Sequence, residues 1–233
     1  SRLRAAGVPH HVVADAFVLN LGEARFDPLR DPVRYPAGWG PVPDAGLGLH
    51  LVQFAGPVRD EWLGGLEIVQ YVHPFTYIVW SEADVLAQRA QAAEVRWTGP
   101  FAPAYRVLPR WRDLPDAPVL VDVLVYRGAG EAATLGALET LGGDRHRYSR
   151  LNDTFGVASY TLAGTAFRAA ARIPGVYSIQ PEPTDGGLRG EMSNQVNVNN
   201  LNASGYAVTG YPAWLASVGL SGAGVRIANV DGG

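Results

Sequence analysis

The chain has 233 residues and contains neither cysteine nor lysine, so all 19 basic residues are arginine. These absences exclude disulfide scaffolds, zinc ribbons, iron–sulfur sites, thiol catalysis, and Schiff-base or P-loop lysine chemistry. The net charge is −3 and no basic run occurs, which argues against a nucleic-acid partner. No stretch approaches about 18 consecutive apolar residues, so we expect no membrane span.

The first part of the chain, residues 1–45, is rich in Pro, Gly, Arg and Asp and contains a single strand candidate, Ala16–Leu21. Such a composition favours extended chain and turns over a packed core. We therefore expect residues 1–45 to form an extended arm that is docked on a neighbouring domain.

A regular alternation of strand and helix patterns begins near residue 48, and we assign residues 46–111 to a first folded unit. Pro57 is well placed as the first residue of a helix, where its missing N–H is harmless. Ser81-Glu82-Ala83-Asp84 matches a capping box for the next helix. The expected elements follow the order β-α-β-β-α-β, with strands at 49–54, 67–72, 76–80 and 94–98 and helices beginning near 57 and 82.

The same order repeats in residues 112–184, which we assign to a second unit. Val119, Val121, Val123 and Val125 alternate along its first strand, as expected of a strand with one buried face. The other expected elements are helices around 135–141 and 167–171 and strands at 145–151, 155–162 and 176–180. The sequence thus predicts an α+β fold of two tandem ferredoxin-like (βαββαβ) units, without predicting the strand order within either unit.

The end of the chain has a different character. Residues 185–208 are polar and rich in Gly and Asn, so we expect a linker. Pro212 lies near the start of a short expected helix that Gly219 ends, and the apolar run Val225–Val230 is typical of a buried parallel strand. Asp231 follows that strand at its carboxyl end, where open α/β folds build active sites. The plain alternative is a strand followed by a turn, with this aspartate as a turn residue.

The run Gly219–Asp231, with the sequence GLSGAGVRIANVD, is similar to the first catalytic motif of the subtilisin-like serine peptidases (subtilases). In that motif a helix and a G-x-G-V entry lead into a buried strand that ends in the catalytic aspartate. The two upstream units look like subtilase propeptides, which share the split β-α-β fold. The resemblance covers residues 46–233 and implies that residues 209–233 begin an α/β subtilisin-like catalytic domain. It makes Asp231 the orienting acid of an Asp-His-Ser triad, with Gly232 where the family usually has Ser or Thr.

By this resemblance the chain is the N-terminal part of a secreted serine endopeptidase precursor, a zymogen whose substrates are proteins or peptides. Its propeptide would bind its own catalytic domain as an inhibitor and folding chaperone. With one triad residue of three, residues 1–233 alone are expected to be inactive and to need no cofactor, while calcium is compatible with the longer protein. The alternative is a non-catalytic inhibitor, or an adhesion module on a degenerate subtilase scaffold.

A propeptide tail that lies in a substrate cleft must be extended and short of bulky side chains. Residues 182–202 meet these conditions: Pro183 keeps the backbone extended, glycines allow close approach, and Met192 offers a side chain for a pocket. We therefore expect self-cleavage between Leu188 and Asn200. The plain alternative is a linker that is never cut.

Other chemistry-bearing residues have plainer explanations. The run Gly219–Ala223 resembles a nucleophile elbow, but an elbow follows a strand and opens a helix, and here the order is reversed. The histidines show no metal-ligand spacing, so we expect them on the surface or at sheet edges. They are His10, His11, His50, His73 and His146.

The tryptophans and two asparagine motifs also have plainer explanations than a ligand or modification site. Tryptophans at strand and helix spacing are more often core residues than a ligand-stacking platform. This applies to Trp62, Trp80, Trp97 and Trp111. Asn152 and Asn202 each begin a glycosylation sequon, a pattern that occurs often by chance. We expect Asp122, in the valine-rich strand, to face solvent or a partner domain.

Overall fold

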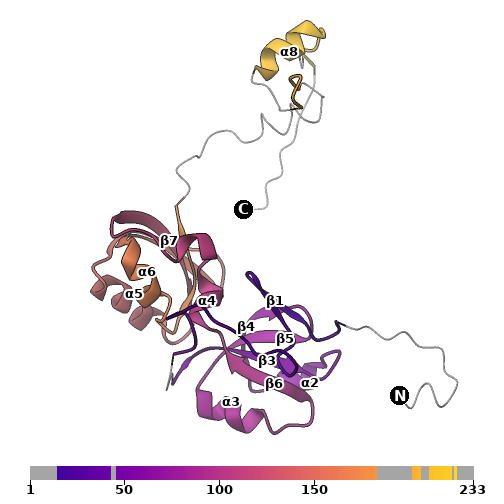
Figure 1. The fold of residues 1–233 in the computed structure, drawn as a ribbon, viewed down its shortest axis with the longest axis vertical. Coiled ribbons are helices and arrows are strands. Elements are labelled where there is room, and N and C mark those ends of the chain that lie inside the picture. The colour runs from indigo at the N-terminus through magenta and orange to yellow at the C-terminus, as the bar shows by residue number, and fades with distance from the viewer. Residues whose placement is uncertain (1–14, 43–45, 183–200, 206–209, 222, 225–233) are drawn as a thin grey trace, which may run out of the picture. The chain divides into compact units, whose positions relative to one another are not determined.

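The computed structural model describes residues 15–42, 46–182, 201–205, 210–221 and 223–224. The chain divides into two compact units, residues 1–182 and 183–233. The described part of the first unit is a mixed α/β structure with more strand than helix, built on two four-stranded antiparallel sheets and a two-stranded hairpin (Figure 1). Among the described residues, no helix is both long and apolar enough to cross a bilayer.

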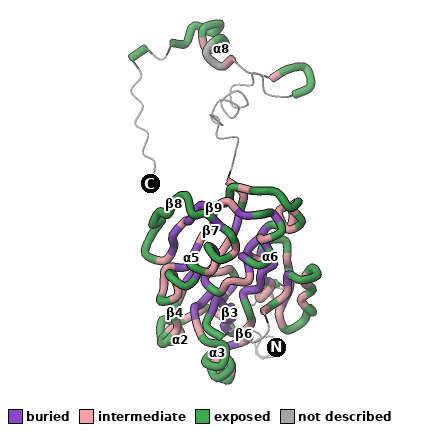
Figure 2. Tube along the Cα trace, turned by 90° about the vertical axis from the view of Figure 1, so that its left-hand side faces the viewer, coloured by how far each residue is buried: buried purple, intermediate pink, exposed green. Residues whose placement is uncertain are grey.

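The first sheet has the strand order β4-β5-β3-β6. Val52 and Phe54 of β3 pack with Leu86 of α3, whereas Leu49 and Leu51, which alternate with them, face the opposite side. Figure 2 shows β3 buried along its length and α3 largely exposed on the outside. The elements are β3 (Gly48–Phe54), α2 (Asp60–Leu63), β4 (Glu67–Val72), β5 (Thr76–Ser81), α3 (Ala83–Arg89) and β6 (Val95–Pro100).

The second sheet has the strand order β10-β7-β9-β8. If the four strands of each sheet are numbered in chain order, both sheets have the order fourth-first-third-second. Val121, Val123 and Val125 are fully buried in a core with residues of α5 and α6, as the alternation predicts. The elements are α4 (Pro103–Arg106), η1 (Pro109–Trp111), β7 (Pro118–Tyr126), α5 (Glu131–Thr140), β8 (Asp144–Arg150), β9 (Phe155–Ala163), η2 (Gly164–Ala166), α6 (Phe167–Ala170) and β10 (Val176–Pro181).

The two sheets share one aromatic core. Trp80 of β5 and Tyr126 of β7 have ring centroids 5.3 Å apart, and Phe101, after β6, stacks on Tyr177 of β10 at 5.5 Å. The Tyr126 hydroxyl also donates a hydrogen bond to the Glu67 carboxylate of β4. Burial and this carboxylate raise the pKa of Tyr126, so the hydroxyl keeps its proton and the contact persists at neutral pH.

The described part of the arm, residues 15–42, is packed on both sheets. Its hairpin consists of β1 (Leu19–Leu21) and β2 (Ala24–Phe26), and Leu19 and Phe26 are buried in the shared aromatic core. Trp39 is 1 % exposed and lies in the core of the second sheet. The strand expected at Ala16–Leu21 is therefore shorter, and its partner β2 was not predicted.

The capping box expected at Ser81–Asp84 is wrong. The N-cap of α3 is Glu82, and no side chain caps the helix. Ser81 still belongs to β5, and its hydroxyl donates to the Glu82 carbonyl oxygen at 3.1 Å instead of capping α3. Pro57 also precedes its helix rather than opening it, because α2 begins at Asp60.

Within residues 183–233 the structure describes one helix, α8 (Tyr211–Ser217), with a proline in its first turn. Gly219 follows it with a φ of 75°, the left-handed conformation that commonly ends a helix. The helix therefore agrees with the sequence prediction. The strand expected at Val225–Val230 lies outside the described residues.

Candidate functional site

The residue with the strongest sequence signal, Asp231, lies outside the described residues, as do Gly232 and the expected processing segment 188–200. The triad role of Asp231 therefore stays a prediction. Ser221 follows α8, and its hydroxyl accepts a hydrogen bond from the Ala223 N–H at 3.2 Å. A serine that follows a helix in this way fits the sequence argument against a nucleophile elbow.

One end of one face of the second sheet is uncovered. Tyr126 and Phe155 on that face are buried in the shared aromatic core, whereas Leu120, at the other end of β7, is 44 % exposed. The uncovered end forms a shallow hollow of about 320 Å³. We call this surface the open face, and its residues are Leu120, Asp122, His146, Arg147, Ser159, Thr161 and Glu182.

The polar side chains of the open face bond to one another. Ser159 Oγ donates to the Asp122 carboxylate at 2.6 Å, and the Arg147 guanidinium donates to Ser159 Oγ at 3.1 Å. His146 Nε2 lies 2.7 Å from Thr161 Oγ1. Asp122 lies on the uncovered side of the sheet, but Ser159 and Arg147 satisfy its carboxylate, whose side chain is 19 % exposed.

This arrangement does not form a nucleophilic site. A serine nucleophile needs a base placed to take its proton and an orienting group behind that base. Ser159 is only 2 % exposed, and its hydroxyl donates a hydrogen bond to Asp122. His146 contacts a threonine instead of this serine. The open face is therefore better suited to contact another surface than to perform catalysis.

The described part of residues 1–182 ends beside the open face. Glu182, the last described residue before the gap that starts at residue 183, donates its N–H to the Leu120 carbonyl oxygen at 2.8 Å. This bond extends the pairing of β10 with β7 by one residue. Whatever follows Glu182 thus starts at the rim of the hollow.

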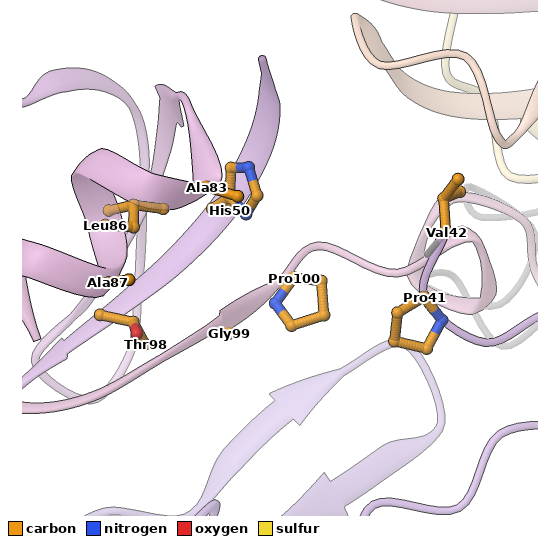
Figure 3. A pocket seen from close by; sticks show the side chains of 9 residues that line it. All are labelled: Pro41, Val42, His50, Ala83, Leu86, Ala87, Thr98, Gly99 and Pro100. Carbon is orange, nitrogen blue, oxygen red and sulfur yellow. The ribbon is translucent and has the colours of Figure 1, made fainter. Parts of the chain in front are cut away.

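Sequence reasoning missed His50. His73 and His146 are exposed, as expected, but His50 lies on the central strand β3 and is 7 % exposed. Figure 3 shows its ring beside Ala83, at a hollow that both residues line. A signal was available, because His50 alternates with Val52 and Phe54 and therefore shares their buried face.

The tryptophans behave as core residues. Trp80 is 5 % exposed in the shared aromatic core, and Trp62, Trp97 and Trp111 are partly buried against apolar clusters. The prediction of core roles is confirmed for these four. Asn152, the first sequon residue, lies exposed in the turn between β8 and β9, where its Oδ1 accepts the N–H groups of Thr154 and Phe155. Among the described residues, no group of three or more His, Asp or Glu side chains is placed to hold a metal ion.

A family model described as a domain of unknown function (DUF8729) matches residues 20–102. The match begins in β1 and ends just after β6, so it covers most of the described arm and the whole first sheet. No curated protein matches the chain.

Proposed function

We propose that the chain is the N-terminal part of a subtilisin-like serine endopeptidase precursor. The observation that carries the proposal is the common strand order of the two sheets, fourth-first-third-second, on a β-α-β-β-α-β chain order. This order supports two tandem ferredoxin-like units, the fold that the resemblance implies for a subtilase propeptide. The units precede the run Gly219–Asp231, which is similar to the first subtilase motif.

In this proposal residues 46–184, with the arm docked on them, are the propeptide, and the open face is a surface of these residues that suits a protein partner. Leu120 supplies exposed apolar area, and Asp122 and Arg147 supply polar groups beside it, the usual composition of a protein interface. Glu182 lies at the same surface, so the tail that follows it starts from the interface. An extended tail can then enter the substrate cleft and inhibit the enzyme.

The chemistry of the proposed enzyme assigns one step to this chain. Asp231 accepts a hydrogen bond from a histidine N–H, which holds the ring in the tautomer that takes the proton of the nucleophilic serine. Its negative charge then stabilises the imidazolium that forms as the serine attacks the peptide carbonyl. Gly232, where the family usually has Ser or Thr, brings no hydroxyl group to hydrogen-bond near that carboxylate.

The N-terminus of the mature protein tests the proposal. The precursor, expressed with all of its coding sequence, is expected to cleave itself between Leu188 and Asn200 and to react with a fluorophosphonate probe of serine nucleophiles. Propeptide added back in trans should then inhibit the mature enzyme. An uncut chain with full activity, or a mature N-terminus upstream of Val176, would contradict the proposal.

The alternative from the sequence, a non-catalytic inhibitor or adhesion module, has one observation in its favour. The family match at residues 20–102 lies wholly outside the run Gly219–Asp231, so nothing in that match requires a peptidase. The coding sequence after Gly233 distinguishes the two functions. A histidine in an H-G-T-H-like context and a serine in a G-T-S-M-A-like context support the peptidase, and the lack of either supports the alternative.

A further inference from the structure

The helix face of the first sheet is only partly covered. The single turn of α2 covers one end, where Trp62 stacks on Phe54 with ring centroids 5.9 Å apart. At the other end, residues of β3, β6 and α3 line an open hollow of about 400 Å³ beside His50 (Figure 3). Its apolar wall is formed by Pro41, Val42, Ala83, Leu86 and Ala87.

A smaller cavity of about 40 Å³ adjoins this hollow, and the two share Pro41, Val42, His50 and Pro100. Arg106 and Gly48 line the smaller cavity. Gly48 leaves space there, because a Cβ at this residue would lie 3.9 Å from His50 Nε2. We call the hollow and the cavity together the His50 pocket.

His50 presents an unused polar atom to this pocket. Its Nε2 is buried and has no hydrogen-bond partner among the described residues. Burial lowers the pKa of His50, and the positive charge of Arg106 lowers it further, against the opposing effect of the Gly46 and Ser81 carbonyl groups. The ring is therefore neutral at neutral pH. An acceptor in the pocket binds the tautomer that carries its proton on Nε2, in place of the tautomer that donates to those carbonyl groups.

Arg106 is a buried cation without a counter-charge in the described part of the chain. Its guanidinium donates to the carbonyl oxygens of Phe101, at 2.8 Å, and Ile173, at 2.7 Å. Arg106 is 6 % exposed, and it takes part in none of the ion pairs between described residues. Burial lowers the pKa of Arg106 to about 9, and it stays protonated at neutral pH. Buried charges in proteins are normally paired, because the desolvation of an unpaired charge is unfavourable.

We propose that the His50 pocket binds a small aliphatic carboxylate. The carboxylate pairs with the Arg106 guanidinium and accepts a hydrogen bond from the His50 ring, and the aliphatic part lies against Leu86 and Ala87. Arg172 also lines the smaller cavity and adds a second positive charge beside the carboxylate. This inference does not depend on the proposed function.

The test uses the full chain labelled with nitrogen-15 and hexanoate as the probe. Hexanoate should cause a saturable shift of the His50 ring nitrogens and of the Gly48 and Thr98 amides, without shifting the rings of the exposed His73 and His146. Hexanamide, which has the same shape without the charge, should bind at least about tenfold more weakly, since charge-assisted hydrogen bonds are the strong ones. Equal binding of hexanamide, or no saturable shift with hexanoate, would overturn the proposal.

Two variants separate binding from folding. Gly48→Ala places a methyl at ordinary contact distances, 3.6 Å from Pro174 Cβ and 3.9 Å from His50 Nε2, so the fold should persist while hexanoate affinity falls at least about tenfold. Arg106→Met removes the charge and should abolish binding. Gly136→Ala is the control, because a Cβ there has no neighbour within 4 Å. Unchanged affinity in folded Gly48→Ala would contradict the assignment.

Two further measurements identify the source of the carboxylate. N-acetyl-leucine, tested beside hexanoate, distinguishes the carboxylate of a peptide C-terminus from that of a free acid. Asp44 lies outside the described residues, close in sequence to Val42, so Asp44→Asn tests whether an internal carboxylate uses the pocket. Binding of hexanoate by Asp44→Asn but not by the unmodified chain would overturn the proposal.

Discussion

Asp27 and Arg96 form a nearly buried ion pair that ties the arm to β6. Asp27 Oδ1 and Arg96 Nη2 are 2.6 Å apart, and the two side chains are 6 % and 13 % exposed, respectively. Burial by itself would raise the pKa of Asp27, but the hydrogen bonds from Arg96 and the Leu29 N–H and the charges of Arg96 and Arg30 outweigh it, so the pKa is lowered. The ionised carboxylate therefore favours the folded state.

This pair predicts an acid-sensitive stability. Because the folded pKa of Asp27 lies below its unfolded value of about 4, its contribution is present above that pH and is lost as the pH falls through the folded pKa. Asp27→Asn leaves Arg96 without its counter-charge and should lower the free energy of unfolding by about 3 kcal/mol at pH 7. Urea unfolding from pH 3 to pH 7 measures both effects. Asp15→Asn, which breaks an exposed pair with Arg25, is the control and should change stability by less than about 1 kcal/mol.

A second prediction at the residue scale concerns Asp231. In the mature form of the proposed peptidase, Asp231→Asn should lower kcat by roughly 10⁴-fold, because the neutral amide favours the wrong histidine tautomer. The unfolding midpoint should stay nearly unchanged, since the substitution preserves side-chain shape. Steady-state kinetics with a peptide substrate measure the first effect and thermal unfolding the second. Wild-type turnover in the variant would remove Asp231 from the triad.

At the scale of elements, α3 lacks a favourable cap. Its N-cap residue Glu82 has extended backbone and makes no side-chain cap hydrogen bond. Aspartate is a preferred N-cap because its shorter side chain reaches the N–H groups of the first turn. Glu82→Asp should therefore raise the free energy of unfolding by about 1 kcal/mol. Glu82→Gln, which cannot cap in this way, is the matched control, and an equal gain in both variants would show that the loss of the glutamate, and not an aspartate cap, is responsible.

The strands could be predicted from the sequence more completely than their arrangement. The valines of β7 alternate, and the strand predicted from them, 119–125, matches Pro118–Tyr126 to within one residue at each end. The strand order could not be predicted, because pairing depends on contacts between residues far apart in the chain. The capping box failed because Ser81 belongs to β5, which the local pattern could not reveal.

Of the two candidate sites, only Asp231 could be predicted from the sequence, because only its motif is local. Asp231 carries a local motif, so the sequence alone suggests its role. The His50 pocket depends on Arg106, a residue far along the chain that α4 brings beside β3 and whose charge acts on the pKa of His50. No local pattern joins these two residues, and only the folded chain places them at one cavity.

At the scale of the whole molecule, the two sheets and the arm form one cooperative unit. Trp80 and Tyr126 belong to different sheets but to one aromatic core, which also contains Leu19 and Phe26 of the arm. Trp39 joins the arm to the core of the second sheet as well. Residues 46–111 and 112–184 are therefore not expected to unfold independently of each other.

The last prediction tests this cooperativity by removing the arm. Residues 15–182 should unfold in a single urea transition, whereas residues 46–182 should lose at least about 4 kcal/mol, because Leu19, Phe26 and Trp39 each contribute roughly 1.5–3 kcal/mol when buried. If the shorter chain does not fold, Trp39→Ala in residues 15–182 gives the same test and should cost about 3–5 kcal/mol. Leu29→Ala, at an arm residue that is 61 % exposed, is the control. Equal stability of residues 15–182 and 46–182 would show that the arm is not part of the folded unit.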